Sequence, residues 1–439
     1  MPAAQPEPTA SLPPRRAVLL IANAAAPYSR GLRVARSLAA KGWQVEIAAV
    51  AMGDGPPSEM DGRIEVRRYA PSGRWARLAH GRPPPPRHGP GGRVRNASDA
   101  VLKLVAWPVH VRGWWATLRR DLPPADLYHA FGILTIAVAV ELAAEARRAG
   151  REGVVIYDVI DVILESNNVA RIPTVAIGAY RWLERRWVRR ANAVVTVNDA
   201  IALHLRTVWG LVDGPTVLQN CQPRWSPPRP RPDLIRAASG LPAERRIVLF
   251  LGRLGPERGL DEVAHAILEI EDATLVFLGF GPWLERLRDR DRDPRFTGRH
   301  VTLPAVHPDD VPAWTASADV SIVAVPANSL NQRLSTPNKF WESLAAGTPI
   351  VVGRDLSVMR GIIEADRLGA VADPADPSDI AAALRGVLDA SQAEREAMRE
   401  RCLRIARERF NWETAVQPYL ALVERLAPEA LTEPSRLPR

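Results

Sequence analysis

The 439-residue sequence has few cysteines, few lysines and no long apolar run. Its two cysteines, Cys221 and Cys402, are too few for a disulfide framework or a cysteine-rich zinc module. No apolar stretch approaches the roughly 18 residues that span a bilayer, so we expect no integral membrane protein. Lysine occurs only at positions 41, 103 and 339, and arginine supplies the rest of the 58 basic residues.

The overall composition is that of a globular protein. Hydrophobic residues make up 46% and charged residues 24%, which argues against wholesale disorder, and the length predicts two or three domains. The net charge of +9 agrees with an arginine-favouring coding bias, but it also favours anionic partners such as nucleotide phosphates or lipid headgroups. The arginines are not interleaved with the aromatics of a recognised module, so we expect no nucleic-acid partner.

The amino terminus superficially resembles a signal peptide. Residues 1–14 are rich in proline and alanine and predict a flexible tail, after which two arginines precede the apolar run Ala17–Ala22. That run is shorter than the usual apolar core of about 7–15 residues. A strand at 18–21, a helix at 32–41 and a strand at 45–50 explain the segment better, so we expect a cytoplasmic chain.

The alternation of apolar strands and amphipathic helices continues along the chain and predicts an α/β fold. We expect two doubly wound, Rossmann-like domains that face each other across a cleft at the carboxyl ends of their sheets. The predicted parts are a first, acceptor-side domain at 15–221 with a Pro/Arg-rich insertion at 71–98, a proline-rich linker at 222–245, a second domain at 246–410, and a helical segment and tail at 411–439.

The first motif lies at residues 249–259, which read LFLGRLGPERG. A buried strand ends at Gly252, where the backbone can approach a ligand closely, and Arg253 and Arg258 follow. Two guanidinium groups at the end of a parallel strand suit a diphosphate, which they can bind through charge-assisted hydrogen bonds. Two surface arginines in an arginine-rich protein are the structural alternative.

A second motif, LGFGP at 278–282, also follows a strand. Its glycines, including Gly281, allow close backbone approach and lead into a helix whose amino terminus can face an anion. The motif lacks a full glycine-rich fingerprint, so an ordinary strand-to-helix turn explains it equally well.

The third motif, STPNKFWESLAAGTP at 335–349, predicts a helix that begins near Pro337. Ser335 and the following threonine are available as caps. The first-turn amides, with Asn338 and Lys339, offer a positive cradle for phosphate. Glu342 lies on the same face and can accept hydrogen bonds from sugar hydroxyls. An ordinary capped helix accounts for the helix but not for the lysine and glutamate together.

With these motifs placed, the chain resembles the retaining glycosyltransferases of the B-type (GT-B) fold, the large group called family 4, over nearly its whole length. Residues 252–259 look like the family's Gly-Arg…Lys-Gly segment, with Arg258 where lysine is usual. The resemblance implies that Arg253 and Arg258 hold the donor diphosphate. Residues 279–282 are similar to the Gly-x-Gly-Pro turn beside the nucleotide. Glu342 matches the second glutamate of the family's paired-glutamate segment, and the implied contact is with the nucleotide ribose.

The amino-terminal half adds further similarities. Residues 28–34 look like the loop and helix start that approaches donor and acceptor, which implies acceptor-side roles for Tyr28, Arg30 and Gly31. His129 follows a strand where the family has a histidine close to the reacting centre, although a single histidine at a strand end is usually structural. Asp161 belongs to a segment that resembles the family's Tyr-Asp-x-His-Glu.

Two positions depart from the family pattern. Leu334 occupies the place of the first glutamate, so donor-sugar contacts must differ there or activity must be weak. Ile160 stands where the family often has a histidine, on the acceptor side. Subfamilies with a Ser-Pro-Asn-Lys-type segment tolerate the first departure.

The resemblance implies transfer of a sugar from a nucleotide diphosphate sugar, with retention of anomeric configuration, to a saccharide or lipid-linked acceptor. The main catalytic task is stabilisation of the charge that develops on the leaving diphosphate. Arg253, Arg258 and Lys339 can do this with His129 positioning the sugar, so we expect no metal and no cofactor. The alternative is a fold relative with little or no turnover that acts as a membrane-associated binding or scaffold protein.

Two stretches combine tryptophan with arginine, at 100–120 and at 182–190. Such helices can lie in the interface of an anionic membrane, which would place a cytoplasmic protein on the inner face of that membrane. The same pattern also fits tryptophans in a core with solvated arginines, and the sequence leaves both interpretations open.

Overall fold

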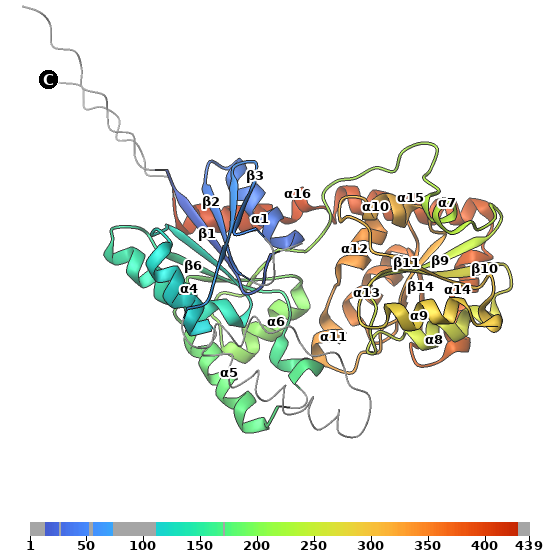
Figure 1. The fold of residues 1–439 in the computed structure, drawn as a ribbon, viewed down its shortest axis with the longest axis horizontal. Helices are drawn as coiled ribbons and strands as arrows, with labels where there is room; N and C mark the ends of the chain where they lie inside the picture. Colours follow the sequence, from blue (N-terminus) through green and yellow to red (C-terminus); the bar gives the residue numbers. More distant parts are fainter. Residues whose placement is uncertain (1–13, 26–27, 52–55, 73–110, 170–171, 429–439) are drawn as a thin grey trace, which may run out of the picture. The chain divides into compact units, whose positions relative to one another are not determined.

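The computed structural model describes residues 14–25, 28–51, 56–72, 111–169 and 172–428. Two sheets, each flanked by helices, account for most of this chain (Figure 1). The predicted α/β fold with two doubly wound sheets is confirmed. The predicted insertion at 71–98 lies outside the described residues except for its first two positions.

The first sheet has eight strands in the order β3-β4-β2-β1-β5-β6-β7-β8. The antiparallel pair β3–β4 forms one edge, whereas β2–β4, β1–β2, β1–β5 and β5–β6 are parallel. After β1 the chain winds to one side through β2 and β4, and it returns at β5, so the strand order reverses between β1 and β5. The strands are β1 Arg16–Ile21, β2 Gln44–Val50, β3 Ser58–Asp61, β4 Ile64–Tyr69, β5 Leu127–Phe131, β6 Val154–Val159, β7 Ala193–Thr196 and β8 Thr216–Val217.

The second sheet has six strands in the order β11-β10-β9-β12-β13-β14, and its recorded pairings are parallel. Its order reverses between β9 and β12. In open parallel sheets, ligands bind outside the carboxyl ends of the strands at such a reversal. The strands are β9 Arg246–Arg253, β10 Ala273–Phe280, β11 His300–Pro304, β12 Val320–Val323, β13 Ile350–Gly353 and β14 Gly369–Ala372.

Helices connect the strands. In the first half they include α1 Ser29–Ala40, α4 Ile133–Arg148, α5 Thr174–Val188 and α6 Asp199–Trp209. In the second half they are α7 Leu234–Ser239, α8 Leu260–Ala266, α9 Leu284–Asp291, α10 Val311–Ala316, α11 Leu330–Leu334, α12 Asn338–Ala345, α13 Ser357–Asp366, α14 Pro377–Leu388, α15 Gln392–Glu408, α16 Trp412–Ala415 and α17 Gln417–Leu426.

Strand β9 shows why its sequence is a continuous apolar run. Val248 and Phe250 belong to one buried cluster, and Ile247 and Leu249 belong to another on the opposite face. Because side chains alternate across a strand and both faces are covered, every position must be apolar. Full burial of each such side chain contributes roughly 1.5–3 kcal/mol. Burial on both faces therefore stabilises β9, the strand that leads into the first motif.

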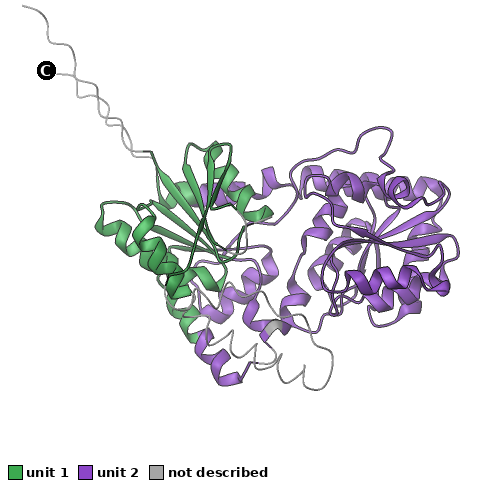
Figure 2. Cartoon of the chain, viewed as in Figure 1, with its two compact units in different colours: residues 1–158, 182–194, 423–439 green, residues 159–181, 195–422 purple. Residues whose placement is uncertain are grey.

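The chain forms two compact units (Figure 2). Unit 1 comprises residues 1–158, 182–194 and 423–439, and unit 2 comprises residues 159–181 and 195–422. In unit 1, Arg15 Nη1 donates to the carbonyl of Ala427 at 3.1 Å, which attaches the end of the carboxy-terminal helical segment to the start of β1.

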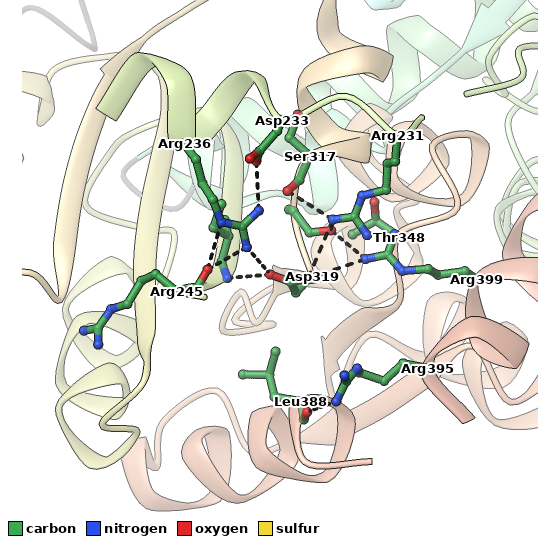
Figure 3. Close-up of polar contacts among 12 residues, drawn as sticks. Arg231, Asp233, Arg236, Arg245, Ser317, Asp319, Thr348, Leu388, Arg395 and Arg399 are labelled. Carbon is green, nitrogen blue, oxygen red and sulfur yellow. Dashed lines mark hydrogen bonds and ion pairs between the residues drawn. The ribbon is translucent and has the colours of Figure 1, made fainter. Parts of the chain in front are cut away.

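Asp319 organises the amino-terminal edge of the second sheet. It precedes β12 and accepts from the backbone N–H of Ile247 at the start of β9, at 2.8 Å. Three guanidinium groups converge on it (Figure 3), with Arg236 at 3.0 Å, Arg231 at 3.6 Å and Arg399 at 3.8 Å. Burial and the neighbouring Arg231 lower the pKa of Arg399 to about 10. The cluster therefore ties α7 and α15 to the sheet at the end opposite its carboxyl edge.

Candidate functional site

The parallel strands β9 and β10 approach each other closely at the carboxyl edge of the second sheet, where the chain turns out of the strands at glycines. Gly252 has φ +101°, a conformation that strongly favours glycine. A Cβ atom on Gly279 would lie 1.8 Å from the carbonyl oxygen of Gly252, and one on Gly281 would lie 2.2 Å from that of Leu254. Glycine is required here because the two strands approach too closely for any side chain. The turn presents backbone next to Arg253, the last residue of β9.

Two arginines lie beside this turn. Arg253 is exposed, and Arg258 is half-buried in the loop before α8. Burial lowers the pKa of Arg258, and the positive charge of Arg253 lowers it further. The carboxylates of Glu257 and, to a smaller extent, Asp161 act in the opposite direction. Two like charges close enough to disfavour each other form a site that an anion would stabilise.

Lys339 adds a third cation in the first turn of α12. Its side chain is 9% exposed, and its Nζ has no hydrogen-bond partner among the described residues. The Nζ lies 3.8 Å from the ring centroid of Phe250. Burial, and then the charge of Arg258, lower the pKa of Lys339 to about 7, while Glu342 opposes the shift. A buried ammonium without a hydrogen-bonded partner is costly unless a ligand compensates it.

The amino terminus of α12 is not capped by a side chain. The helix begins at Asn338 with Pro337 at its N-cap, so the expected caps are not formed, and the Ser335 hydroxyl donates instead to the carbonyl of Gln332. Two amide side chains that sequence reasoning did not identify contact this helix. Asn220 Nδ2 donates to Asn338 Oδ1 at 2.5 Å. Gln222 Nε2 donates to Glu342 Oε1 at 3.4 Å.

Leu334, one of the two positions that depart from the family pattern, lies shortly before α12. Leu334 ends α11, and its carbonyl accepts from Asn198 Nδ2 at 2.8 Å. Asn331 in the same helix donates to Asp161 Oδ1 at 3.1 Å and accepts from the backbone of Val162 at 2.7 Å. Amide and backbone contacts therefore hold the segment in which the family has its first glutamate.

Unit 1 contains a separate buried polar cluster at the reversal between β1 and β5. Arg30 in α1 donates twice to Asp158 at the end of β6, at 2.9 and 3.0 Å. His129 Nε2 lies 3.1 Å from the same carboxylate. Burial alone would raise the pKa of Asp158, but Arg30 and His129 hold it below its ordinary value. Burial lowers the pKa of His129 despite the carboxylate.

The remaining predicted residues of this half pack around the same cluster. The Tyr28 ring, at the N-cap of α1, meets Phe131 edge-on with centroids 5.5 Å apart. A Cβ on Gly31 would lie 2.6 Å from the Tyr28 ring, so glycine lets the tyrosine pack there. Asp158 lies in the segment that resembles the family's Tyr-Asp-x-His-Glu, but no role was predicted for it from the sequence. Its signal is a carboxylate at the end of an otherwise apolar strand, and in register it pairs with Phe131.

Aspartates at alternate positions, a spacing that can bind metals, occur at 289–293. Each of these carboxylates contacts a basic side chain: Asp289 with Arg292, Asp291 with His300, and Asp293 with Arg295. These aspartates belong to surface and strand-edge ion pairs rather than to the carboxyl edge of the sheet.

Two family matches cover most of the chain. Residues 29–221 match the glycosyl transferase 4-like domain, and residues 245–390 match glycosyl transferases group 1. The two doubly wound sheets, together with these two domain matches, place the chain in the class of GT-B glycosyltransferases. Within it, the chain belongs to the family 4-like glycosyltransferases.

Curated relatives match about two fifths of the chain. The GDP-mannose-dependent alpha-(1-6)-phosphatidylinositol monomannoside mannosyltransferase of Mycobacterium tuberculosis is 30% identical over 192 residues, which are 42% of this chain and 47% of that protein. The D-inositol 3-phosphate glycosyltransferase of a Nocardioides species is 28% identical over 216 residues, 44% of each chain. The chain thus spans less than half the length of these relatives.

Solved structures share the fold over nearly the whole chain. Sucrose-phosphate synthase from Thermosynechococcus elongatus superposes with a TM-score of 0.70 at 16% identity, covering 94% of this chain and 99% of that one. Anabaena HepE in complex with UDP superposes with a TM-score of 0.66 at 15% identity, covering 93% of this chain and 100% of that one. Across the described parts of the chain, none of the helices is both long and apolar enough to cross a membrane.

Proposed function

We propose that the protein transfers a sugar from a nucleotide diphosphate sugar to a saccharide or lipid-linked acceptor, with retention at the anomeric carbon and without a metal. The observation that carries the proposal is the convergence of Arg253, Arg258 and the buried Lys339 at the carboxyl edge of the second sheet. A diphosphate is the ligand that compensates these charges best. The HepE structure contains UDP, and the mycobacterial relative is named for GDP-mannose, which supports the class of donor.

In this mechanism the three cations stabilise the charge that develops on the leaving diphosphate as the sugar–oxygen bond breaks. Such preorganised charge is worth most where water is excluded, as it is around Lys339. The Gly252 and Gly281 turn lets the phosphates approach the backbone. Glu342 accepts from the nucleotide ribose, held by Gln222, and Asn338 lies in the first turn that faces the phosphates.

The acceptor-side roles are proposed for Tyr28, Arg30, Gly31 and Asp161. His129 positions the sugar or its hydroxyls, and Asp158 fixes its ring. Since Arg30 is paired with Asp158, its contribution is to hold the start of α1 rather than to bind substrate directly. The apolar stretch Arg16–Ile21, which superficially resembles part of a signal peptide, is a central strand of the first sheet, and a cytoplasmic location is part of this proposal.

The test is a transfer assay with a panel of labelled UDP-, GDP- and ADP-sugars and of saccharide and lipid-linked acceptors. We expect one donor to be turned over, with the product keeping the donor's anomeric configuration by NMR. Arg258→Ala and Lys339→Met should each lower kcat by about 10²–10³-fold. Arg292→Ala, at an exposed arginine near the end of α9, is the matched control and should leave kcat unchanged.

Nucleotide-sugar binding without transfer to any acceptor would instead favour the inactive, scaffold-like relative. Full activity of both site variants would overturn the proposed role of the cations. A strict requirement for a divalent metal would overturn the metal-free mechanism.

A further inference from the structure

Helix α5 presents a face to solvent that the proposed chemistry does not use. Val175 and Trp182 are seven residues apart and therefore lie nearly on one line along the helix, and Arg189 follows directly after its last residue, Val188. Val175 is 86% exposed and Trp182 is 63% exposed. Exposed side chains this large and apolar are uncommon in monomeric soluble proteins when they share one face with nothing packed on them.

The same face is strongly basic toward its carboxy-terminal end. Arg185, Arg186 and Arg189 are exposed, and none of them has an ion pair among the described residues. The arginines at the two edges of the face differ, because Arg181 pairs with Glu165 and Arg190 with Glu141. The part of the chain that the structure describes therefore does not neutralise the basic charge at the centre of the face.

The opposite face of α5 explains why the helix is oriented this way. Glu184 is the only acidic residue between positions 172 and 190. It accepts from the Tyr157 hydroxyl at 2.6 Å, and Val188 is buried. The inward face is thus fixed by a partly buried hydrogen bond and a buried apolar side chain, which leaves the outward face with apolar and basic residues alone.

The other Trp/Arg stretch has a different character. Trp114 is buried in the core of unit 1, and Arg119 pairs with Glu145. Residues 100–110 of that stretch lie outside the described residues. Within the described part of the chain, the membrane interpretation therefore rests on α5.

We propose that the outward face of α5, defined by Val175, Trp182, Arg185, Arg186 and Arg189, docks the protein on an anionic phospholipid bilayer. The indole of Trp182 suits the interface, where its apolar ring is buried and its N–H remains hydrated. The arginines lie at the headgroup level and bind lipid phosphates, each contributing about a fivefold gain in binding near an anionic surface. This inference goes beyond the transfer reaction, because it concerns a surface outside the site.

The test is flotation of the full chain with vesicles of phosphatidylcholine alone or with phosphatidylglycerol. We expect binding only to the phosphatidylglycerol vesicles in 50 mM salt, and its loss in 500 mM salt because the attraction is screened. Replacing all three arginines, Arg185→Ala/Arg186→Ala/Arg189→Ala, should weaken binding by about 100-fold. Trp182→Ala should weaken it by about tenfold, since one interfacial side chain is lost.

The matched control removes the same number of charges elsewhere. Arg288, Arg292 and Arg295 are surface arginines of unit 2, each paired with a nearby acid, and their triple alanine variant should bind vesicles like the wild type. Equal losses in both triple variants would mean that net charge alone attracts the protein, and would overturn the assignment to α5. Absence of binding at 50 mM salt would overturn it as well. Far-UV circular dichroism of each variant ensures that a loss of binding is not a loss of fold.

Discussion

At Lys339 a charged side chain is held where its charged form is disfavoured. The ammonium lies over the Phe250 ring without a hydrogen-bond partner among the described residues, and its pKa of about 7 leaves a large share of the molecules neutral near pH 7. A bound pyrophosphate would supply the missing negative charge. The pKa of Lys339 would then rise toward its ordinary value, so ligand binding and proton binding are linked.

This linkage predicts proton uptake when pyrophosphate or a nucleoside diphosphate binds. Between the pKa of about 7 in the free protein and the higher pKa in the complex, the complex holds more protons. The affinity should therefore fall as pH rises above 7, by at most about tenfold per pH unit. Calorimetry in buffers of different ionisation enthalpy measures the uptake directly.

Lys339→Met is the control for this prediction, because it keeps a long apolar side chain but cannot titrate. The variant should bind more weakly and lose the part of the proton uptake that does not come from the ligand's own phosphates. The same uptake in the wild type and in Lys339→Met would contradict the assignment.

Asp158 supports a second prediction at the residue scale. Asp158→Asn would leave the guanidinium of Arg30, which is 2% exposed, without its countercharge, and should destabilise the fold by about 3–5 kcal/mol. The carboxylate has a lowered pKa, so its stabilising effect is present at neutral pH and is lost as the pH falls through the depressed value. The difference in melting temperature between wild type and variant should accordingly shrink in acid.

The exposed pair of Arg120 and Asp121 provides the comparison, and Asp121→Asn should leave the melting temperature nearly unchanged. An Asp158→Asn variant as stable as the wild type would show that the buried pair makes no net contribution.

The residues of the candidate site differ in how far the sequence could identify them. Arg253, Arg258, Lys339 and Glu342 follow strands or begin a helix in short motifs, and the topology brings such positions to one edge of a sheet. Three polar partners of predicted residues were missed, because each lies more than 100 positions away along the chain: Asp158 from Arg30, Asn220 from Asn338, and Gln222 from Glu342.

Among the elements, the strands were the most predictable and the helix starts the least. Apolar runs such as Ile247–Leu251 mark strands buried on both faces, and the structure has β9 there. The start of α12 was expected with side-chain caps, but Pro337 is itself extended, with φ −67° and ψ 156°, and takes the N-cap position. Because proline has no side-chain group that can accept a hydrogen bond, the first amides of the helix are left without a side-chain cap.

The contact between β9 and β10 predicts a large effect of a small substitution. In Gly279→Ala the new methyl group would lie 1.8 Å from the carbonyl of Gly252, so the two strands would have to separate. We expect a loss of about 1–3 kcal/mol in the free energy of unfolding, together with weaker pyrophosphate binding because the turn is displaced.

Gly386 in α14 is a matched control, since nothing lies within 4 Å of a Cβ atom built there. Gly386→Ala should stabilise the protein by about 0.5–1 kcal/mol, because alanine is the better helix former. Urea unfolding of both variants separates the two effects. A Gly279→Ala protein as stable as Gly386→Ala would mean that the strands can move apart freely.

For the whole molecule, the alternation of strands and helices was enough to predict two doubly wound sheets, because right-handed crossovers allow few other arrangements. The proline-rich linker at 222–245 stays a prediction. The compact units join stretches that are separate in the sequence, such as residues 1–158 with 423–439. Composition cannot reveal this, since it depends on which distant segments pack together.

The net charge of +9 and the cationic site together predict how binding depends on salt. Pyrophosphate is attracted both by the site and by the field of the whole protein, whereas an uncharged nucleoside is attracted by neither. Raising the salt from 50 to 500 mM shortens the distance over which charges act to a few ångströms, so the affinity for pyrophosphate should fall several-fold. The nucleoside of the preferred donor should bind equally well at both salt concentrations. Calorimetric titrations with the two ligands measure both affinities. An affinity for pyrophosphate that does not change with salt would contradict a binding site formed by cationic side chains.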